Sequence, residues 1–220
     1  YILVKDSVSM KYLGILSLSS DYNNLSSRDK YIGWDTEEKY KKLINTMNIS
    51  TCVSTQPFGF NYNGGKLITA LCFSKEVLSY YHEKYNDHLL GITTTSLYGK
   101  SIQYERLPYI KFMGLTKGNS VHKISTSTVK LCKQIMKDDF NMDVTKYSKL
   151  HILMGCLRKL NIPREEYLTS NKKGVYFGYT HKNSKEYLCG NIHNEPNPIN
   201  SAQTSDEIFK WWVNRWGNNR

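Results

Sequence analysis

Short runs of apolar and β-prone residues recur along the chain and predict a sheet. The first two runs are joined by a polar stretch at residues 5–11, which predicts a hairpin of two antiparallel strands. The later runs are rich in valine, isoleucine, threonine and aromatic residues and end at turn-forming residues. The predicted strands cover residues 1–4, 12–18, 49–60, 89–97, 109–115 and 174–179.

Apolar residues at helical spacing mark other segments. One such stripe runs from Leu67 to Tyr81, and Thr36 is placed to cap a helix whose first turn is acidic. The predicted helices cover residues 37–46, 66–85, 127–140 and 148–160, a final helix runs from a cap at Thr204 or Ser205 to Trp216, and residues 183–188 form a helical turn. Residues 19–35 are dense in serine, asparagine and aspartate, which predicts an ordered loop packed on the sheet.

This order of elements favours a mixed α/β (α+β) fold with a central sheet flanked by helices. We interpret residues 1–190 as one α/β domain and residues 191–220 as an irregular tail that ends in an amphipathic helix. That helix is rich in tryptophan, and Ile208, Trp212 and Trp216 lie on one of its faces. Because Tyr1 stands within a strand-like pattern, we expect that the true N-terminus is missing.

The net charge favours a polyanionic partner. The 220 residues include 30 Lys and Arg against 19 Asp and Glu, which gives a formal net charge of +11 and a pI near 9.3. Such a balance favours nucleic acid over an acidic small molecule, and a solvated basic surface is the alternative. The 17 Tyr, 7 Phe and 4 Trp supply rings on which bases could stack, although most should belong to the core.

Cysteine usage and hydropathy bear on the cellular setting. The five cysteines are widely separated and odd in number, and neither they nor the six histidines have metal-site spacing, so we predict no metal. Reduced thiols fit a cytoplasmic, reducing environment. We expect no membrane association, because the chain has no run of about 18 apolar residues and no N-terminal signal pattern.

The turn before the helix at residues 66–85 is the first candidate binding site. Asn61, Gly64, Gly65 and Lys66 combine backbone N–H groups, the positive end of a helix dipole and one ammonium group, which together suit a phosphate. Their spacing is neither that of a Walker loop nor that of a dinucleotide fingerprint. A plain tight turn is therefore the alternative.

The polar loop at residues 19–35 contains a second candidate. Arg28 could bind a phosphate and Trp34 could stack on a base. The alternative is structural, because Arg28 and Asp29 could form a pair that buttresses the loop while Trp34 anchors it. Residue types alone do not separate these two interpretations.

Further candidates follow two of the predicted strands. Tyr98, Tyr104 and Arg106 come after the strand at residues 89–97, at the kind of strand end where open α/β sheets commonly place ligands. A basic edge next to the strand at 174–179 could track a phosphate backbone, and its lysines are Lys172, Lys173 and Lys182. A solvated face is the alternative for these lysines.

Several motifs resemble the DruA-like domain of Druantia anti-phage systems. They are LGILSLSSD, RDKYIGWD, NGGKL, the segment from TTSLYG to KFMGLTKG, and KKGVYFGYT, in order over roughly residues 10–190. The motifs of that family are also similar to those of phage Mom-type DNA-modifying proteins and, through them, to the GNAT acyltransferase fold. The resemblance therefore implies a GNAT-like sheet and a role on DNA rather than on RNA.

In the GNAT fold the turn after the fourth strand binds the pyrophosphate of a CoA-type cofactor. Carried over to this chain, the resemblance places Asn61, Gly64, Gly65 and Lys66 near such a cofactor, although the chain lacks the full spacing of acetyl-CoA binders.

The leading hypothesis is a DNA-acting protein with a GNAT-like cleft that either modifies a base, as a DNA-modifying transferase, or recognises DNA structure. If it is an enzyme, the catalytic residues are expected within the predicted set. Asp29 would be the base, and Tyr98 or Tyr104 would be the proton donor. The alternative is a non-catalytic DNA-binding or protein-docking module of a defence, phage or viral complex. A protein partner would then bind through the C-terminal tryptophan helix.

Overall fold

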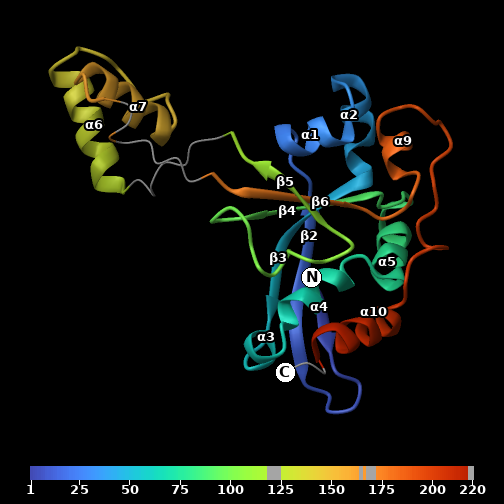
Figure 1. Ribbon diagram of the computed structural model, residues 1–220. Coiled ribbons are helices and arrows are strands. Elements are labelled where there is room, and N and C mark those ends of the chain that lie inside the picture. Colours follow the sequence, from blue (N-terminus) through green and yellow to red (C-terminus); the bar gives the residue numbers. More distant parts are fainter. Residues whose placement is uncertain (118–124, 164–165, 167–171, 218–220) are drawn as a thin grey trace. The chain divides into compact units, whose positions relative to one another are not determined.

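The computed structural model describes residues 1–117, 125–163, 166 and 172–217 (Figure 1). The chain forms two compact units, whereas the sequence interpretation treats residues 1–190 as one domain. Residues 1–116 and 173–220 make up the first, which we call the sheet unit. Residues 117–172 make up the second, which we call the helical unit.

The sheet unit is built on six strands in the order β1-β2-β3-β4-β6-β5. Neighbouring strands are antiparallel except for β3 and β4, which run parallel. The strands are β1 (Ile2–Lys5), β2 (Tyr12–Ser20), β3 (Thr46–Ser54), β4 (Gly91–Ser96), β5 (Lys111–Leu115) and β6 (Gly174–Tyr179). The predicted hairpin of β1 and β2 is confirmed. The predicted extension of β3 to residue 60 is wrong, because Pro57 cannot donate to a ladder and a short helix follows.

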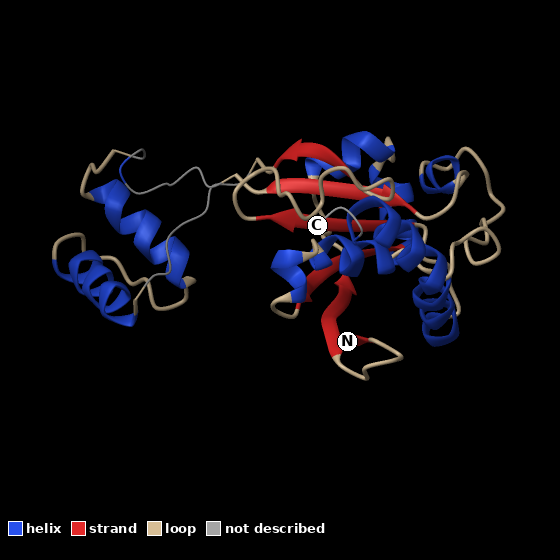
Figure 2. Ribbon diagram, turned by 60° about the horizontal axis from the view of Figure 1, so that its bottom comes forward, coloured by secondary structure: helices blue, strands red, loops and turns tan. Residues whose placement is uncertain are grey.

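Helices cover both faces of this mixed α/β sheet (Figures 1 and 2). They are α1 (Ser26–Ile32), α2 (Thr36–Lys42), the 3₁₀ turn η1 (Leu43–Asn45), α3 (Phe58–Asn61), α4 (Gly64–Leu71), α5 (Lys75–Tyr85), α9 (Ser184–Leu188), α10 (Ser205–Trp212) and the π-helical turn η2 (Val213–Gly217). Tyr176 and Phe177 are neighbours on β6 and point to opposite faces. Tyr176 joins the core under α4 and α10, whereas Phe177 joins the core under α1.

Helix α1 lies where the sequence predicts a loop, so that prediction is wrong. Leu25, Arg28 and Ile32 are all buried and follow helical spacing. The middle position of this buried stripe is an arginine, so an apolar periodicity does not appear in the sequence. Gly33 ends the helix in the left-handed conformation, with φ of 82°.

The segment at residues 66–85 forms two helices, not the single helix predicted. Helix α4 ends at Leu71, and the Ser74 hydroxyl accepts from the backbone N–H of Val77 and begins α5. The cap of α2 also differs, because the Asp35 carboxylate, not Thr36, accepts from the backbone N–H of Glu38. Ser74, which lies within the predicted apolar stripe, thus acts as the N-cap of a second helix.

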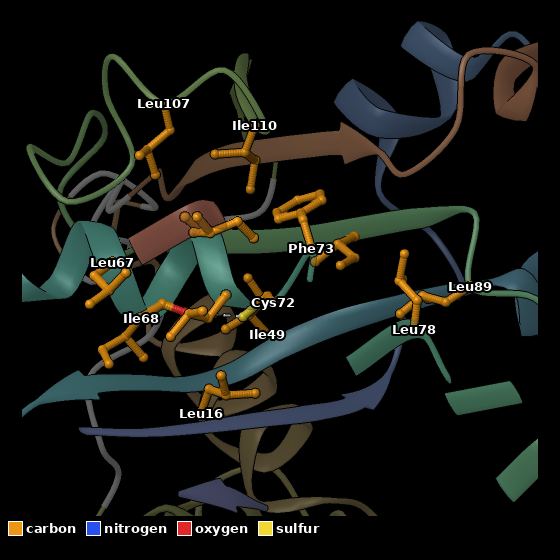
Figure 3. Close-up of a cluster of buried hydrophobic side chains, with 14 of the residues drawn as sticks. Leu16, Ile49, Leu67, Ile68, Cys72, Phe73, Leu78, Leu89, Leu107 and Ile110 are labelled. Atoms are coloured by element: carbon orange, nitrogen blue, oxygen red, sulfur yellow. Dashed lines mark hydrogen bonds between the residues drawn. The ribbon is translucent and has the colours of Figure 1, made fainter. Parts of the chain in front are cut away.

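The main core lies between the sheet and helices α4, α5 and α10 (Figure 3). Leu16 of β2 and Ile49 of β3 face Leu67 and Ile68 of α4, as the close-up shows, and all four are buried. Burying side chains of this size stabilises the fold by about 1.5–3 kcal/mol each. The C-terminal helix packs on the same core through Ile208 and Trp212, as its predicted stripe requires.

The helical unit contains α6 (Thr126–Asp138) and α7 (Lys149–Lys159), which confirms both predicted helices. The two helices share a small core, whose buried residues are Val129, Cys132, Met136, Val144, Ile152 and Cys156. Serine side chains cap both helices at their first turns, Ser125 for α6 and Ser148 for α7.

Candidate functional site

The central strands β3 and β4 separate after a short parallel pairing. Their register joins residues 46–48 to residues 91–93, although both strands continue further. Just beyond the pairing, the Thr94 hydroxyl donates to the carbonyl of Ile49 over 3.3 Å and bridges the strands. Beyond this point β3 and β4 diverge, so the later residues of β3 have no ladder partner on the β4 side, while β4 stays paired with β6 along its whole length.

Residues 101–106, in the loop between β4 and β5, fill this edge. The side-chain amide of Gln103 donates to the carbonyl of Cys52 on β3 over 3.1 Å and to the Thr69 hydroxyl on α4 over 3.3 Å. Tyr104 packs against Tyr176, with 5.1 Å between the ring centroids. Burial raises the pKa of Tyr104 to about 12. The space between the strands therefore holds side chains of the chain itself.

Two further anchors hold the same loop. The Lys66 ammonium group on α4 donates to the carbonyls of Ile102 and Glu105, the latter over 2.6 Å. Lys66 is 5% exposed, and burial lowers its pKa. The Tyr176 hydroxyl donates to the Glu105 carboxylate over 2.8 Å and accepts from the backbone N–H of Ser101 over 2.8 Å. The loop is thus tied to α4, β3 and β6.

The turn at residues 61–66 does not fit the pyrophosphate of a CoA-type cofactor. An added Cβ at Gly64 would lie 2.4 Å from the Phe58 ring, and one at Gly65 would lie 3.1 Å from the Gln103 side chain. Both glycines therefore permit close packing within the chain. The Lys66 ammonium, which a phosphate would need, is engaged by loop carbonyls.

The end of the chain also reaches Lys66. Its Nζ lies 5.3 Å from the centroid of the Trp216 ring, and the Arg215 guanidinium lies 5.1 Å from the same ring. Arg106 is exposed and has a positive φ of 63°, and after burial it is the next cause of the lowered pKa of Lys66. The structure thus brings together Lys66, Tyr104 and Arg106 from the predicted set. Arg215 and Trp216 join them from a distant segment, which spacing in the sequence cannot reveal.

Arg28 and Asp29 belong to a buried ion-pair network on the other face of the sheet. The Arg28 guanidinium lies 2.7 Å from Asp21 and 2.7 Å from Asp29, and Arg28 is 0% exposed. The Trp34 ring lies 5.3 Å from the guanidinium carbon and is buried as well. The Thr93 hydroxyl on β4 donates to the Asp21 carboxylate over 2.7 Å. This geometry matches the structural alternative and leaves no surface of Arg28 open to a phosphate.

The three predicted catalytic residues do not meet at one point. Asp29 accepts from the backbone N–H of Leu25 over 3.2 Å and lies on α1, which packs on β5 and β6. Tyr104 packs on the opposite face of the sheet, and Tyr98 is 91% exposed. A base and a proton donor of one reaction must reach the same substrate. This structure therefore does not place them as partners in one reaction.

The other predicted contact residues lie on the surface. The exposed residues are Asn61, Arg106, Lys172, Lys173 and Lys182. Lys172 belongs to the helical unit, and the others belong to the sheet unit. Sequence reasoning missed Asp21 and Glu105, which are acidic residues that hold Arg28 and Tyr176. Only the position of Asp21 directly after a strand could have drawn attention to it.

A family model described as Druantia protein DruA matches residues 1–190. The chain belongs to the Druantia DruA family. The Druantia protein DruA of Escherichia coli (strain UMEA 4076-1) is 33% identical over 133 residues, which cover 53% of this chain and 33% of that relative. The chain therefore spans about a third of the length of that family member. No solved structure matches it.

Family membership confirms the resemblance to DruA that the motifs predict, whereas the similarity to Mom-type proteins stays a prediction. None of the helices that the structure describes has the length and apolarity of a membrane span. Within the same residues, His, Cys, Asp and Glu side chains do not gather in threes as a metal site would require. All five cysteines are free thiols.

Proposed function

We propose that this member of the Druantia DruA family is a non-catalytic DNA-binding part of an anti-phage defence protein. The proposal rests on one observation, which is that the predicted catalytic and cofactor residues and the predicted DNA-contact residues lie in different environments. The side chains proposed for catalysis or cofactor binding are mostly engaged inside the sheet unit, as for Asp29, Tyr104 and Lys66. The cationic side chains proposed for DNA contact are exposed, with the exception of Arg28.

The defence role rests on the family. Druantia systems act against phage, and the match to DruA covers residues 1–190 of this chain. This chain matches about a third of the length of the E. coli protein. A defence activity of the whole E. coli protein is therefore extended to this chain only as part of the proposal. The preference for DNA over RNA rests on the same family resemblance, and the net charge of +11 supports a polyanionic partner.

Fluorescence anisotropy with labelled single- and double-stranded DNA and RNA, across a salt series, tests DNA binding. We expect affinity for DNA that falls steeply with salt, because each phosphate contact releases a counterion. Arg106→Gln with Lys182→Gln should weaken DNA binding and lower the salt slope by about 2, at roughly 0.9 for each contact. Lys11→Gln with Lys75→Gln removes the same charge from other exposed positions and should change the slope less.

Two results would count against the proposal. Wild-type protein that binds neither DNA nor RNA at low salt would remove nucleic acid as the partner. A mass change in the nucleosides of DNA incubated with the protein and acyl-CoA would refute the non-catalytic part.

A GNAT-like transferase is the second candidate, and the separation of β3 and β4 favours it. A parallel pair that diverges after residues 46–48 supplies the kind of gap in which a GNAT-like cleft could form. The cofactor could enter only if residues 101–106 left the gap. A thermal shift on adding CoA that grows in Gln103→Ala, which loosens the loop, but is unchanged in Lys11→Gln would support this candidate. Equal melting temperatures with and without CoA would argue against it.

Docking of a protein partner through the C-terminal helix has less support. Trp212 is 4% exposed and Ile208 is fully buried against α4, so most of the apolar stripe is already covered. Phe209, which is 43% exposed, is the part of the stripe that a partner could reach.

A further inference from the structure

The helical unit carries a disproportionate share of the positive charge. Residues 117–172 contain eleven Lys and Arg but five Asp and Glu, so six of the eleven net charges fall on about a quarter of the chain. Counted along the sequence, the excess is spread, with modest enrichment at residues 129–190. The concentration of positive charge appears when the charges are counted within the compact unit at residues 117–172.

Three of these lysines form a stripe along α6. Lys130, Lys133 and Lys137 follow the spacing i, i+3 and i+7, which places them on one side of the helix. The buried residues of α6 have the same spacing one position earlier and pack against α7. At a rise of 1.5 Å per residue, the stripe spans about 10 Å of the helix. Lys130 and Lys137 are exposed, and Lys133 is half-buried.

In the described part of the unit no ion pair neutralises this stripe, although the Asp143 carboxylate interacts electrostatically with Lys133 and Lys137. In the part of the unit that the structure describes, no Lys or Arg side chain lies within 4 Å of a carboxylate. In the sheet unit, by contrast, Lys39, Lys41 and Lys42 of one helix each lie within that distance of an acidic side chain, whereas the control positions Lys11 and Lys75 do not. One nearby carboxylate offsets only part of the charge of three ammonium groups, so the row still raises the local concentration of anions and attracts a polyanion most strongly.

The stripe ends at a cleft of about 510 Å³, lined by Lys133, Lys137 and residues 141–145. Asp143 also lines this cleft, and hydrogen bonds from Thr145 keep its pKa below the ordinary value, so it is ionised at neutral pH. A carboxylate in the cleft opposes the entry of a small free anion. The stripe, which extends beyond the cleft, suits a polymer with repeated phosphates.

We propose that the helical unit binds the DNA backbone through Lys130, Lys133 and Lys137. The inference rests on the proposed DNA-binding function and names the surface that performs it. An acidic protein is the less suitable partner, because protein interfaces are depleted in lysine and enriched in arginine and aromatic residues. The stripe consists of lysine alone. Contacts of this kind hold phosphates and carry no sequence preference.

The test compares three triple variants of the full chain. Lys130→Gln, Lys133→Gln and Lys137→Gln remove the stripe while keeping good helix formers. The matched control replaces three exposed lysines of the sheet unit with glutamine, which are Lys11, Lys75 and Lys210. A third variant carries arginine at the three stripe positions and keeps the charge. Circular dichroism and thermal unfolding check that each variant is folded.

The readout is the slope of log affinity for a DNA duplex against log salt concentration. The stripe variant should lose up to about 3 in slope, because each phosphate contact contributes roughly 0.9. The arginine variant should keep the wild-type slope, and the control should change it by less than about 1. A stripe variant that binds with wild-type slope, or a control that loses as much, would overturn the inference while leaving DNA binding by the chain intact. Wild-type protein that does not bind DNA would overturn both proposals.

Discussion

Arg28→Met should destabilise the sheet unit strongly. The Arg28 guanidinium is fully buried and lies 2.7 Å from Asp21, whose side chain is 0% exposed. Without it, the Asp21 carboxylate would keep the hydroxyl of Thr93 as its remaining side-chain contact within hydrogen-bond distance. Removing one partner of a buried ion pair costs about 3–5 kcal/mol, because the other charge stays buried without an opposite charge. For a protein of this size, the melting temperature should fall by roughly 6–20 °C.

Urea denaturation of a double-mutant cycle measures this cost. Asp21→Asn combined with Arg28→Met removes both charges, so the double variant should be more stable than the sum of the single effects, by about 1–3 kcal/mol. Lys41→Met breaks an exposed ion pair with Glu37 and should change stability much less.

The same variant separates the two interpretations of Arg28. If Arg28 is structural, Arg28→Met should bind DNA with wild-type affinity at a temperature where it is folded. The reasoning fails if Arg28→Met is as mild as Lys41→Met, if the double-mutant effects are additive, or if the folded variant loses DNA affinity selectively.

Three further predictions concern the loop at residues 101–106 and its supports. An unfolded tyrosine ionises near pH 10, whereas Tyr104 has a pKa of about 12, so the unfolded chain loses this proton first and stability should fall as pH rises from about 10 to 12. A spectrophotometric titration should show one fewer late-ionising tyrosine in Tyr104→Phe. Lys66→Met removes the ammonium that binds two loop carbonyls, and hydrogen exchange of the loop should rise about tenfold, which corresponds to roughly 1.4 kcal/mol; unchanged exchange would show that the tie is not needed. Gly64→Ala should cost about 1–3 kcal/mol in denaturant unfolding because its Cβ meets the Phe58 ring, and Phe58→Leu should recover part of that loss.

The candidate site shows where sequence reasoning succeeds and where it stops. The turn at residues 61–66 was identified because asparagine and glycine punctuate the chain there, and the structure does place a helix start at Gly64. Its function could not be inferred in the same way. The Lys66 ammonium group is unavailable to a phosphate because it donates to carbonyls of a loop about 40 residues further along the chain. No local sequence pattern encodes that contact.

Arg28 is a second residue whose environment could not be predicted from the sequence. A charged residue in a polar segment is typical of a surface, so its burial and the helix around it were hidden from periodicity. Asp21, Asp29 and Trp34 make the burial possible, and they converge only when α1 packs on the sheet.

Composition and local pattern suffice to predict the basic character of the protein, most of its strands, both helices of the helical unit and its family. Those properties depend on composition, on local periodicity and on ordered motifs, all of which can be read along the chain. Three other properties emerge only from the folded chain: which cations are buried, what fills the space between β3 and β4, and how the positive charge divides between the units. These properties depend on contacts between distant segments. Such contacts bury a charged side chain and so make it unavailable to a ligand, and they determine which side of a helix stays exposed.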